Sequence, residues 1–129
     1  MQSQTECYRI AFQPHTGYVM MKWEGYATSA EFKEGTELML NTLIKNQATK
    51  VLADIKRMTL IGMEDQQWLN NVFLPRAINF GLKAVAITWP DYYFNKVAVE
   101  TVSDNIDKTR LQVAFFDTKA QAEEWLLAI

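Results

Sequence analysis

The sequence has 129 residues, of which 49% are hydrophobic and 22% are charged, and its formal net charge is −2. The length suits one domain spanning residues 1–129, and the composition is that of a globular chain, far from the charge-rich profile of disorder. Lysines and arginines are spread along the chain. This argues against binding to nucleic acid, because phosphate backbones require concentrated positive charge.

The chain holds one cysteine, Cys7, and one histidine, His15. These exclude an intramolecular disulfide and a Cys/His zinc site, so we expect no metal and no cofactor. Residues 1–10 lack the basic and apolar regions of a signal peptide, and no apolar run approaches the roughly 18 residues that span a bilayer. We therefore expect a cytoplasmic protein without a membrane span.

The first two strands are predicted from large apolar residues at every second position in residues 7–12 and again in residues 19–23. Pro14 and Gly17 lie between these segments and suit a short reversal, which predicts an antiparallel hairpin. Thr28 and Glu31 have the spacing of a capping box, so a helix should begin there. Asn46 is suited to close that helix.

The rest of the chain alternates strands and helices. Residues 50–55 and 83–89 are short apolar runs typical of strands buried on both faces. Residues 64–80 carry a broad apolar helical face, with Pro75 expected to kink or split the helix and Gly81 to end it. We expect a helix over 94–102, a strand over 111–116 and a last helix capped by Asp117 or Thr118.

This order, β-β-α-β-α-β-α-β-α, predicts an α/β mixed sheet in which an N-terminal antiparallel hairpin is followed by parallel strands joined by right-handed crossovers. Ligands of such sheets bind outside the carboxyl ends of the parallel strands. Two loops, 56–63 and 89–93, should therefore carry the binding site. The candidate site residues are those in or beside these loops: Asp54, Arg57, Met58, Thr59, Met63, Glu64, Trp68, Trp89, Asp91, Tyr92 and Tyr93.

Two features of these loops have more than one interpretation. The aromatic side chains of Trp89, Tyr92 and Tyr93 either cover the end of the sheet or form an exposed surface for an apolar ligand or a protein partner. Glu64 and Asp65 either form a carboxylate pair for acid-base chemistry or complement the dipole of the helix that they begin.

The chain resembles the STAS family of anti-sigma-factor antagonists and sulphate-transporter tails. The resemblance is carried by VLADIKRM, the helix from Glu64, KAVAITW and FFDTKAQAEEWL, and it implies the same α/β fold. Asp54 matches the family's strand-end aspartate. Gly62, Met63, Glu64 and Asp65 stand where antagonist members carry a phosphorylatable serine, so that serine is absent and Glu64 supplies a fixed negative charge. The chain is more similar to the divergent SpoIIAA-like branch, which is similar in fold to CRAL-TRIO lipid carriers.

Three functions follow as hypotheses. The first is a non-catalytic regulatory or protein-interaction module whose partner docks on the two loops. The second is a binder of a small apolar or lipid-like ligand, held by Met58, Met63, Trp68 and residues 89–94. The third is an enzyme that uses Asp54, Glu64 or Asp65 with Arg57 as an anion clamp. Pairing of two copies through surface Trp and Met side chains remains open.

Overall fold

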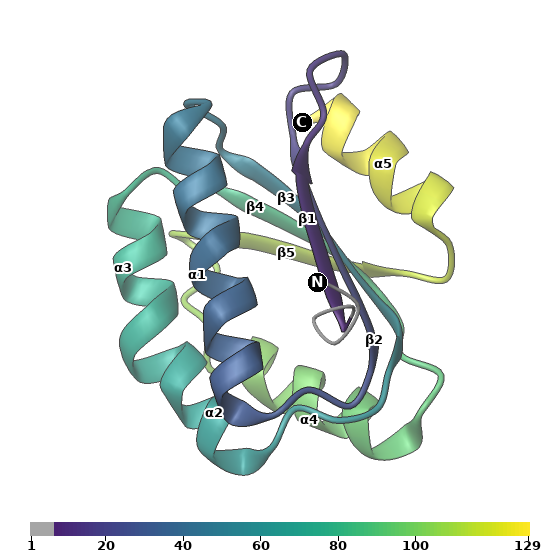
Figure 1. Ribbon diagram of the computed structural model, residues 1–129. Helices are drawn as coiled ribbons and strands as arrows, with labels where there is room; N and C mark the ends of the chain where they lie inside the picture. Colours follow the sequence, from purple (N-terminus) through teal and green to yellow (C-terminus); the bar gives the residue numbers. More distant parts are fainter. Residues whose placement is uncertain (1–6) are drawn as a thin grey trace, which may run out of the picture.

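The computed structural model describes residues 7–129. Residues 1–6 belong to the segment in which we expect no signal-peptide features, and they lie outside the described residues. Five strands form one sheet in the order β1-β2-β3-β4-β5 (Figure 1). β1 and β2 are antiparallel, and every later neighbour is parallel. The strands are β1 (Tyr8–Phe12), β2 (Val19–Gly25), β3 (Lys50–Met58), β4 (Ala84–Thr88) and β5 (Gln112–Phe116).

The helices lie in two layers on opposite faces of the sheet. They are α1 (Ser29–Lys45), α2 (Met63–Trp68), the π-helical turn η2 (Leu69–Phe73), α3 (Leu74–Asn79), α4 (Tyr93–Asp104) and α5 (Lys119–Ala128). The strand order never reverses, so right-handed crossovers place α1 to α4 on one face, which we call the crossover face. α5 follows the last strand and lies against the other, the α5 face (Figure 1).

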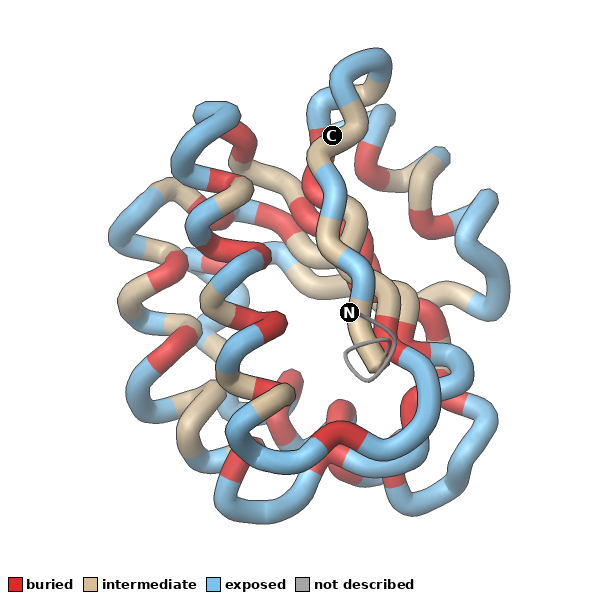
Figure 2. Tube along the Cα trace, in the orientation of Figure 1, coloured by how far each residue is buried: buried red, intermediate tan, exposed pale blue. Residues whose placement is uncertain are grey.

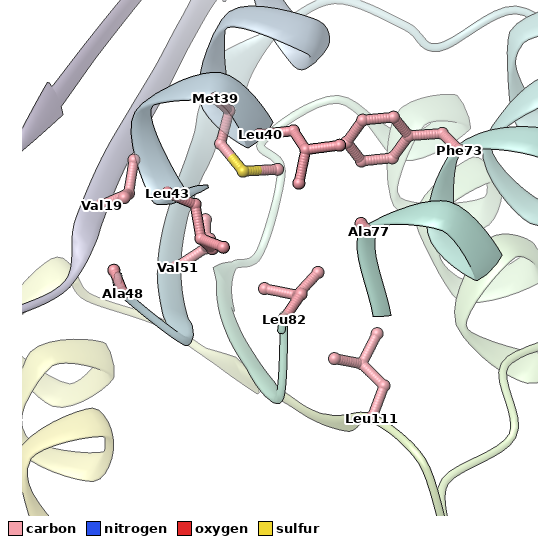
Figure 3. Packing of buried hydrophobic residues seen from close by; sticks show 10 residues of the cluster. All are labelled: Val19, Met39, Leu40, Leu43, Ala48, Val51, Phe73, Ala77, Leu82 and Leu111. Carbon is pink, nitrogen blue, oxygen red and sulfur yellow. The ribbon is translucent and has the colours of Figure 1, made fainter. Parts of the chain in front are cut away.

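Alternation along β3 separates the two halves of the core. Val51 belongs to the cluster on the crossover face, whereas the next residue, Leu52, packs with Ala122 and Leu126 of α5. Figure 2 shows buried residues concentrated along the strands and along the sheet-facing sides of the helices. Figure 3 shows ten residues of the first cluster, among them Met39 of α1 and Phe73 of η2.

The local signals for the hairpin and for the helix ends are confirmed. β1 pairs with β2 in an unbroken antiparallel register. Thr28 is the N-cap of α1 and forms a capping box with Glu31, and Asn46 is the C-cap of that helix. Thr118, with Gln121 as its capping-box partner, begins α5.

The helix expected over residues 64–80 is interrupted by η2. Pro75 lies in the first turn of α3, directly after η2, and has no N–H to donate to the preceding helical turn. The turn before Pro75 has the π-helical form. The segment therefore consists of α2, η2 and α3 in succession. Gly81, with φ of 116°, follows the end of α3, which agrees with the expectation that this glycine ends the helix.

β3 is longer than the strand expected over residues 50–55, and it contains a β-bulge. Lys22 lies opposite Asp54, but Glu24 lies opposite Arg57, so β3 has one extra residue there. The bulge reverses the alternation of β3: Met58 turns toward the crossover face and Arg57 away from it. Lys56, Arg57 and Met58 are therefore strand residues, and the loop that was expected from residue 56 begins at Thr59.

Candidate functional site

The candidate site is the edge of the sheet where the parallel strands β2, β3 and β4 end. Three loops leave that edge, residues 26–28, 59–62 and 89–92. Backbone hydrogen bonds join them: the Thr59 amide donates to the Gly25 carbonyl at 3.0 Å, and the Asp91 amide donates to the Lys56 carbonyl at 2.9 Å. The two loops expected to form the site are thus brought to one edge and held in place.

Asn95, in the first turn of α4, fastens the loop after β3. Its side chain is 0% exposed. Its Oδ1 accepts from the Ile61 amide at 2.9 Å, and its Nδ2 donates to the Met58 carbonyl at 3.3 Å. An unpaired amide buried at this point would be costly, so Asn95 fixes the position of the loop relative to α4.

The bulge in β3 is stabilised by Thr88 and Asp54. The Ile55 amide donates to Thr88 Oγ1 at 3.0 Å, and that hydroxyl donates to Asp54 Oδ1 at 3.0 Å. Asp54 also accepts from the Lys56 amide at 3.3 Å. The carboxylate of Asp54 therefore satisfies backbone and hydroxyl donors of the strand ends.

Large apolar side chains stand exposed along this edge. Leu60 and Phe94 flank the hydrogen bond between Ile61 and Asn95, and the exposed fractions of Met63, Tyr93 and Phe94 are 74%, 70% and 74%. The Tyr93 and Phe94 rings meet edge to face with centroids 5.5 Å apart. We call the set the loop-edge patch: Tyr26, Leu60, Met63, Tyr92, Tyr93 and Phe94.

Charged side chains border the loop-edge patch in pairs of opposite sign. Arg57 lies 3.7 Å from Glu24 on the neighbouring strand, and Lys56 lies 3.3 Å from Asp91. Glu64 is exposed in the first turn of α2, where the helix dipole favours a negative charge. The border is polar and close to neutral, unlike the concentrated positive surface that binds nucleic acid.

The two tryptophans among the expected site residues are packed against other rings. Trp89 stacks on Phe115 with centroids 4.2 Å apart, and Lys96 Nζ lies 5.1 Å from its ring. Trp68 lies between Phe32 and Phe73, with centroid separations of 6.3 and 5.4 Å. Trp68 and Trp89 are half-buried, whereas Tyr92 and Tyr93 are exposed.

A partly open cavity of about 110 Å³ lies between the sheet and the helices of the crossover face. Its walls are mostly apolar side chains from β2, β3, β4, β5 and the helices, and Met58 is one of them. Met58 reaches it because the bulge turns its side chain inward. Of the residues expected to hold an apolar ligand, Met58 lines this cavity, whereas Met63, Tyr92 and Tyr93 lie on the surface.

The carboxylates considered for acid-base chemistry are separated. Asp65 is buried in α2 and accepts from Ser29 Oγ at 2.6 Å, while Asp54 points to the α5 face and Glu64 to the surface. No set of three His, Cys, Asp or Glu side chains in residues 7–129 is arranged to hold a metal ion. Among the described residues, the strand order also lacks the reversal that forms a ligand crevice in many α/β sheets.

Sequence reasoning missed Asn95, Leu60 and Tyr26. An asparagine inside a helical segment gives no sign that its amide will reach a loop more than thirty residues earlier, because that contact exists only after the strands pair. The exposure of Leu60 was equally hidden, since leucine is more often buried. The one available signal was the aromatic run Trp89, Tyr92 and Tyr93, which the structure places at the end of β4 and the start of α4.

None of the helices among the described residues has the length and apolar character needed to cross a membrane. No protein-family model matches the chain, and no curated protein matches it. Among solved structures, the chain is similar to an uncharacterized protein of the DUF3478 family with a SpoIIAA-like fold from Shewanella loihica. The two are 20% identical with a TM-score of 0.62, and the match covers 92% of this chain and 91% of that one. The chain therefore has the SpoIIAA-like α/β fold that its resemblance to STAS domains implied.

Proposed function

We propose that the chain is a non-catalytic regulatory or scaffolding module of the cytoplasm that binds a protein partner through the loop-edge patch. The observation that carries the proposal is the exposure of Met63, Tyr93 and Phe94 at the starts of α2 and α4, beside a loop that hydrogen bonds hold in place. Aromatic side chains fixed on a rigid support lose little entropy on binding and are common energetic centres of interfaces.

Two further features support a protein partner. The paired charges at the border, Arg57 with Glu24 and Lys56 with Asp91, resemble the polar rim of protein interfaces. Glu64 places a negative charge at the start of α2, which is the position of the phosphorylated serine in the STAS antagonists that the sequence resembles. A fixed charge there suits constitutive binding, without a phosphorylation step.

Photo-crosslinking tests this proposal. Benzoylphenylalanine is placed at Tyr93 or, as a control, at Phe80, an exposed aromatic residue at the opposite edge of the sheet. We expect crosslinked partners that are specific to position 93, and we expect Phe94→Glu to weaken the affinity of the recovered partner about tenfold or more. Phe80→Glu should leave that affinity unchanged.

Capture of the same proteins from both positions would contradict the proposal. Sedimentation of the purified chain tests a second copy as the partner: a dimer that Phe94→Glu dissociates would identify that partner as the chain itself.

A second candidate function is the binding of a small apolar ligand, and the apolar cavity of the crossover face favours it. An engineered dry cavity of roughly 150 Å³ in another protein binds benzene or xenon, and the cavity here, at about 110 Å³, is of the same order. Protein purified without detergent should show extra mass in native mass spectrometry, and that mass should disappear when the cavity is filled by Ala53→Leu.

A further inference from the structure

The wall of the cavity contains a buried hydroxyl group that has no hydrogen-bond partner. Thr36, in the middle of α1, is 3% exposed and lines the cavity. Its Oγ1 is a buried oxygen without a donor or acceptor within reach among the described residues. Leaving such a group unpaired destabilises a protein by about 1–3 kcal/mol, so it requires an explanation.

Other threonines in helices of this chain avoid that cost. Thr42, also in α1, donates to the Leu38 carbonyl at 2.8 Å, and Thr101 in α4 donates to the Val97 carbonyl at 2.9 Å. In each case the acceptor lies four residues earlier, which is the usual acceptor for a helical threonine. Thr36 makes no such bond to Phe32. Its hydroxyl is left available at the wall of the cavity.

The rest of the wall limits what could pair with this hydroxyl. Met39, Val51, Phe73, Leu82 and Leu111 are representative of the lining, and Figure 3 shows their side chains. An ion would lose its hydration here without compensation, which excludes charged ligands. A water molecule needs two to four polar partners, and the only other hydroxyl in the lining belongs to Ser103 of α4.

We infer that the ligand of the cavity is a small neutral amphiphile: an apolar body of about one ring, with one oxygen or nitrogen that hydrogen-bonds the Thr36 hydroxyl. This inference rests on the second candidate function and specifies its ligand. The apolar body fills the cavity, and the single polar atom takes the hydrogen bond that the Thr36 hydroxyl leaves unused.

Benzene, phenol and xenon are suitable probes. Binding is followed by the ¹³C-methyl signals of methionine, because Met21, Met39 and Met58 line the cavity whereas Met63 is exposed on the surface. We expect all three probes to shift the signals of the lining methionines and to leave the Met63 signal in place. Ala53→Leu, which adds carbon atoms to the wall at β3, should abolish these shifts.

The Thr36→Val variant tests the hydrogen bond. It keeps the shape of the side chain and removes the hydroxyl, so phenol should bind about five- to tenfold more weakly, while the affinity for benzene should stay within about twofold. Thr42→Val is the matched control, since that hydroxyl is already bonded within α1. It should change neither affinity.

The outcomes separate the inference from the function beneath it. If benzene and xenon bind but phenol is excluded, or if Thr36→Val leaves the phenol affinity unchanged, the assigned ligand chemistry is wrong and the cavity remains a site for purely apolar molecules. If none of the probes shifts the signals of Met21, Met39 and Met58, both the inference and the second candidate function are wrong. If Ala53→Leu does not fold, those three signals still report directly whether a probe occupies the cavity.

Discussion

Gly35, in the middle of α1, is expected to resist replacement by alanine. Glycine in a helix interior is less favourable than alanine by about 0.8–1 kcal/mol, so helix propensity alone predicts that Gly35→Ala stabilises the protein. The surroundings oppose this. A Cβ atom at position 35 would lie 2.6 Å from Cη2 of Trp23, 2.9 Å from its Cζ2 and 2.9 Å from Cδ2 of Tyr8.

The size of the opposing effect follows from these distances. Carbon atoms in contact prefer separations of about 3.5–4.0 Å, so the new methyl group would overlap Trp23 by about 1 Å. Trp23 has little freedom to withdraw, because its ring packs against both Tyr8 and Phe32. Overpacking of this kind costs about 1–3 kcal/mol. With the gain in propensity subtracted, we expect Gly35→Ala to lower the free energy of unfolding by up to about 2 kcal/mol and Tm by up to about 8 °C.

Denaturant unfolding, followed by far-ultraviolet circular dichroism, measures this change. Asn41→Ala is the control: Asn41 is exposed in the same helix, and its replacement should be neutral or slightly stabilising. In a Trp23→Phe background the far ring of the indole is gone, so the penalty of Gly35→Ala should shrink by about 1 kcal/mol or more. A Gly35→Ala variant that is more stable than the wild type, or whose penalty is the same in both backgrounds, would refute the steric argument.

Three further changes have expected outcomes. Asn95→Ala leaves the buried Ile61 amide without an acceptor and should lower the free energy of unfolding by about 2–3 kcal/mol, whereas Asn41→Ala should not, as chemical denaturation would show. Gln47, with φ of 54°, follows the end of α1 in a left-handed conformation, so Gln47→Gly should raise the free energy of unfolding by about 0.5–1 kcal/mol; a loss of stability would contradict this. Burial, together with a hydrogen bond to a glutamate, raises the pKa of Tyr18 from 10.0 to about 12, so the folded state keeps this proton more tightly than the unfolded state. The stabilisation from Tyr18 is complete below pH 10 and is lost as pH rises from about 10 to 12, and denaturant midpoints should fall less steeply over that range in Tyr18→Phe.

The elements that were predicted correctly carry their signals within a few residues. The capping box of Thr28 and Glu31 is a local exchange of hydrogen bonds, and alternation in the hairpin is enforced by one buried face. Such features form wherever the local sequence allows them. They were sufficient to predict the order of strands and helices and the mixed sheet.

The bulge of β3 shows why the site itself was harder to predict. Two adjacent charged residues, Lys56 and Arg57, looked like the start of a loop, yet both belong to the strand. Whether a strand continues past such residues depends on its neighbours, here β2 at Glu24 and the Thr88 hydroxyl that binds the Ile55 amide. Neither neighbour is close in sequence, so the inward turn of Met58 and the cavity that it lines were beyond local reasoning.

The side chain of Asn95 couples two segments that come from different crossover units. Because the Ile61 amide is bonded to α4, it can exchange its hydrogen with solvent only when the start of α4 separates from the loop after β3. The two segments should therefore open together, with a common free energy in hydrogen-exchange measurements. A partner that binds only the aromatic start of α4 would slow exchange at Ile61 without touching it, and the loop and the helix would respond to binding as one unit.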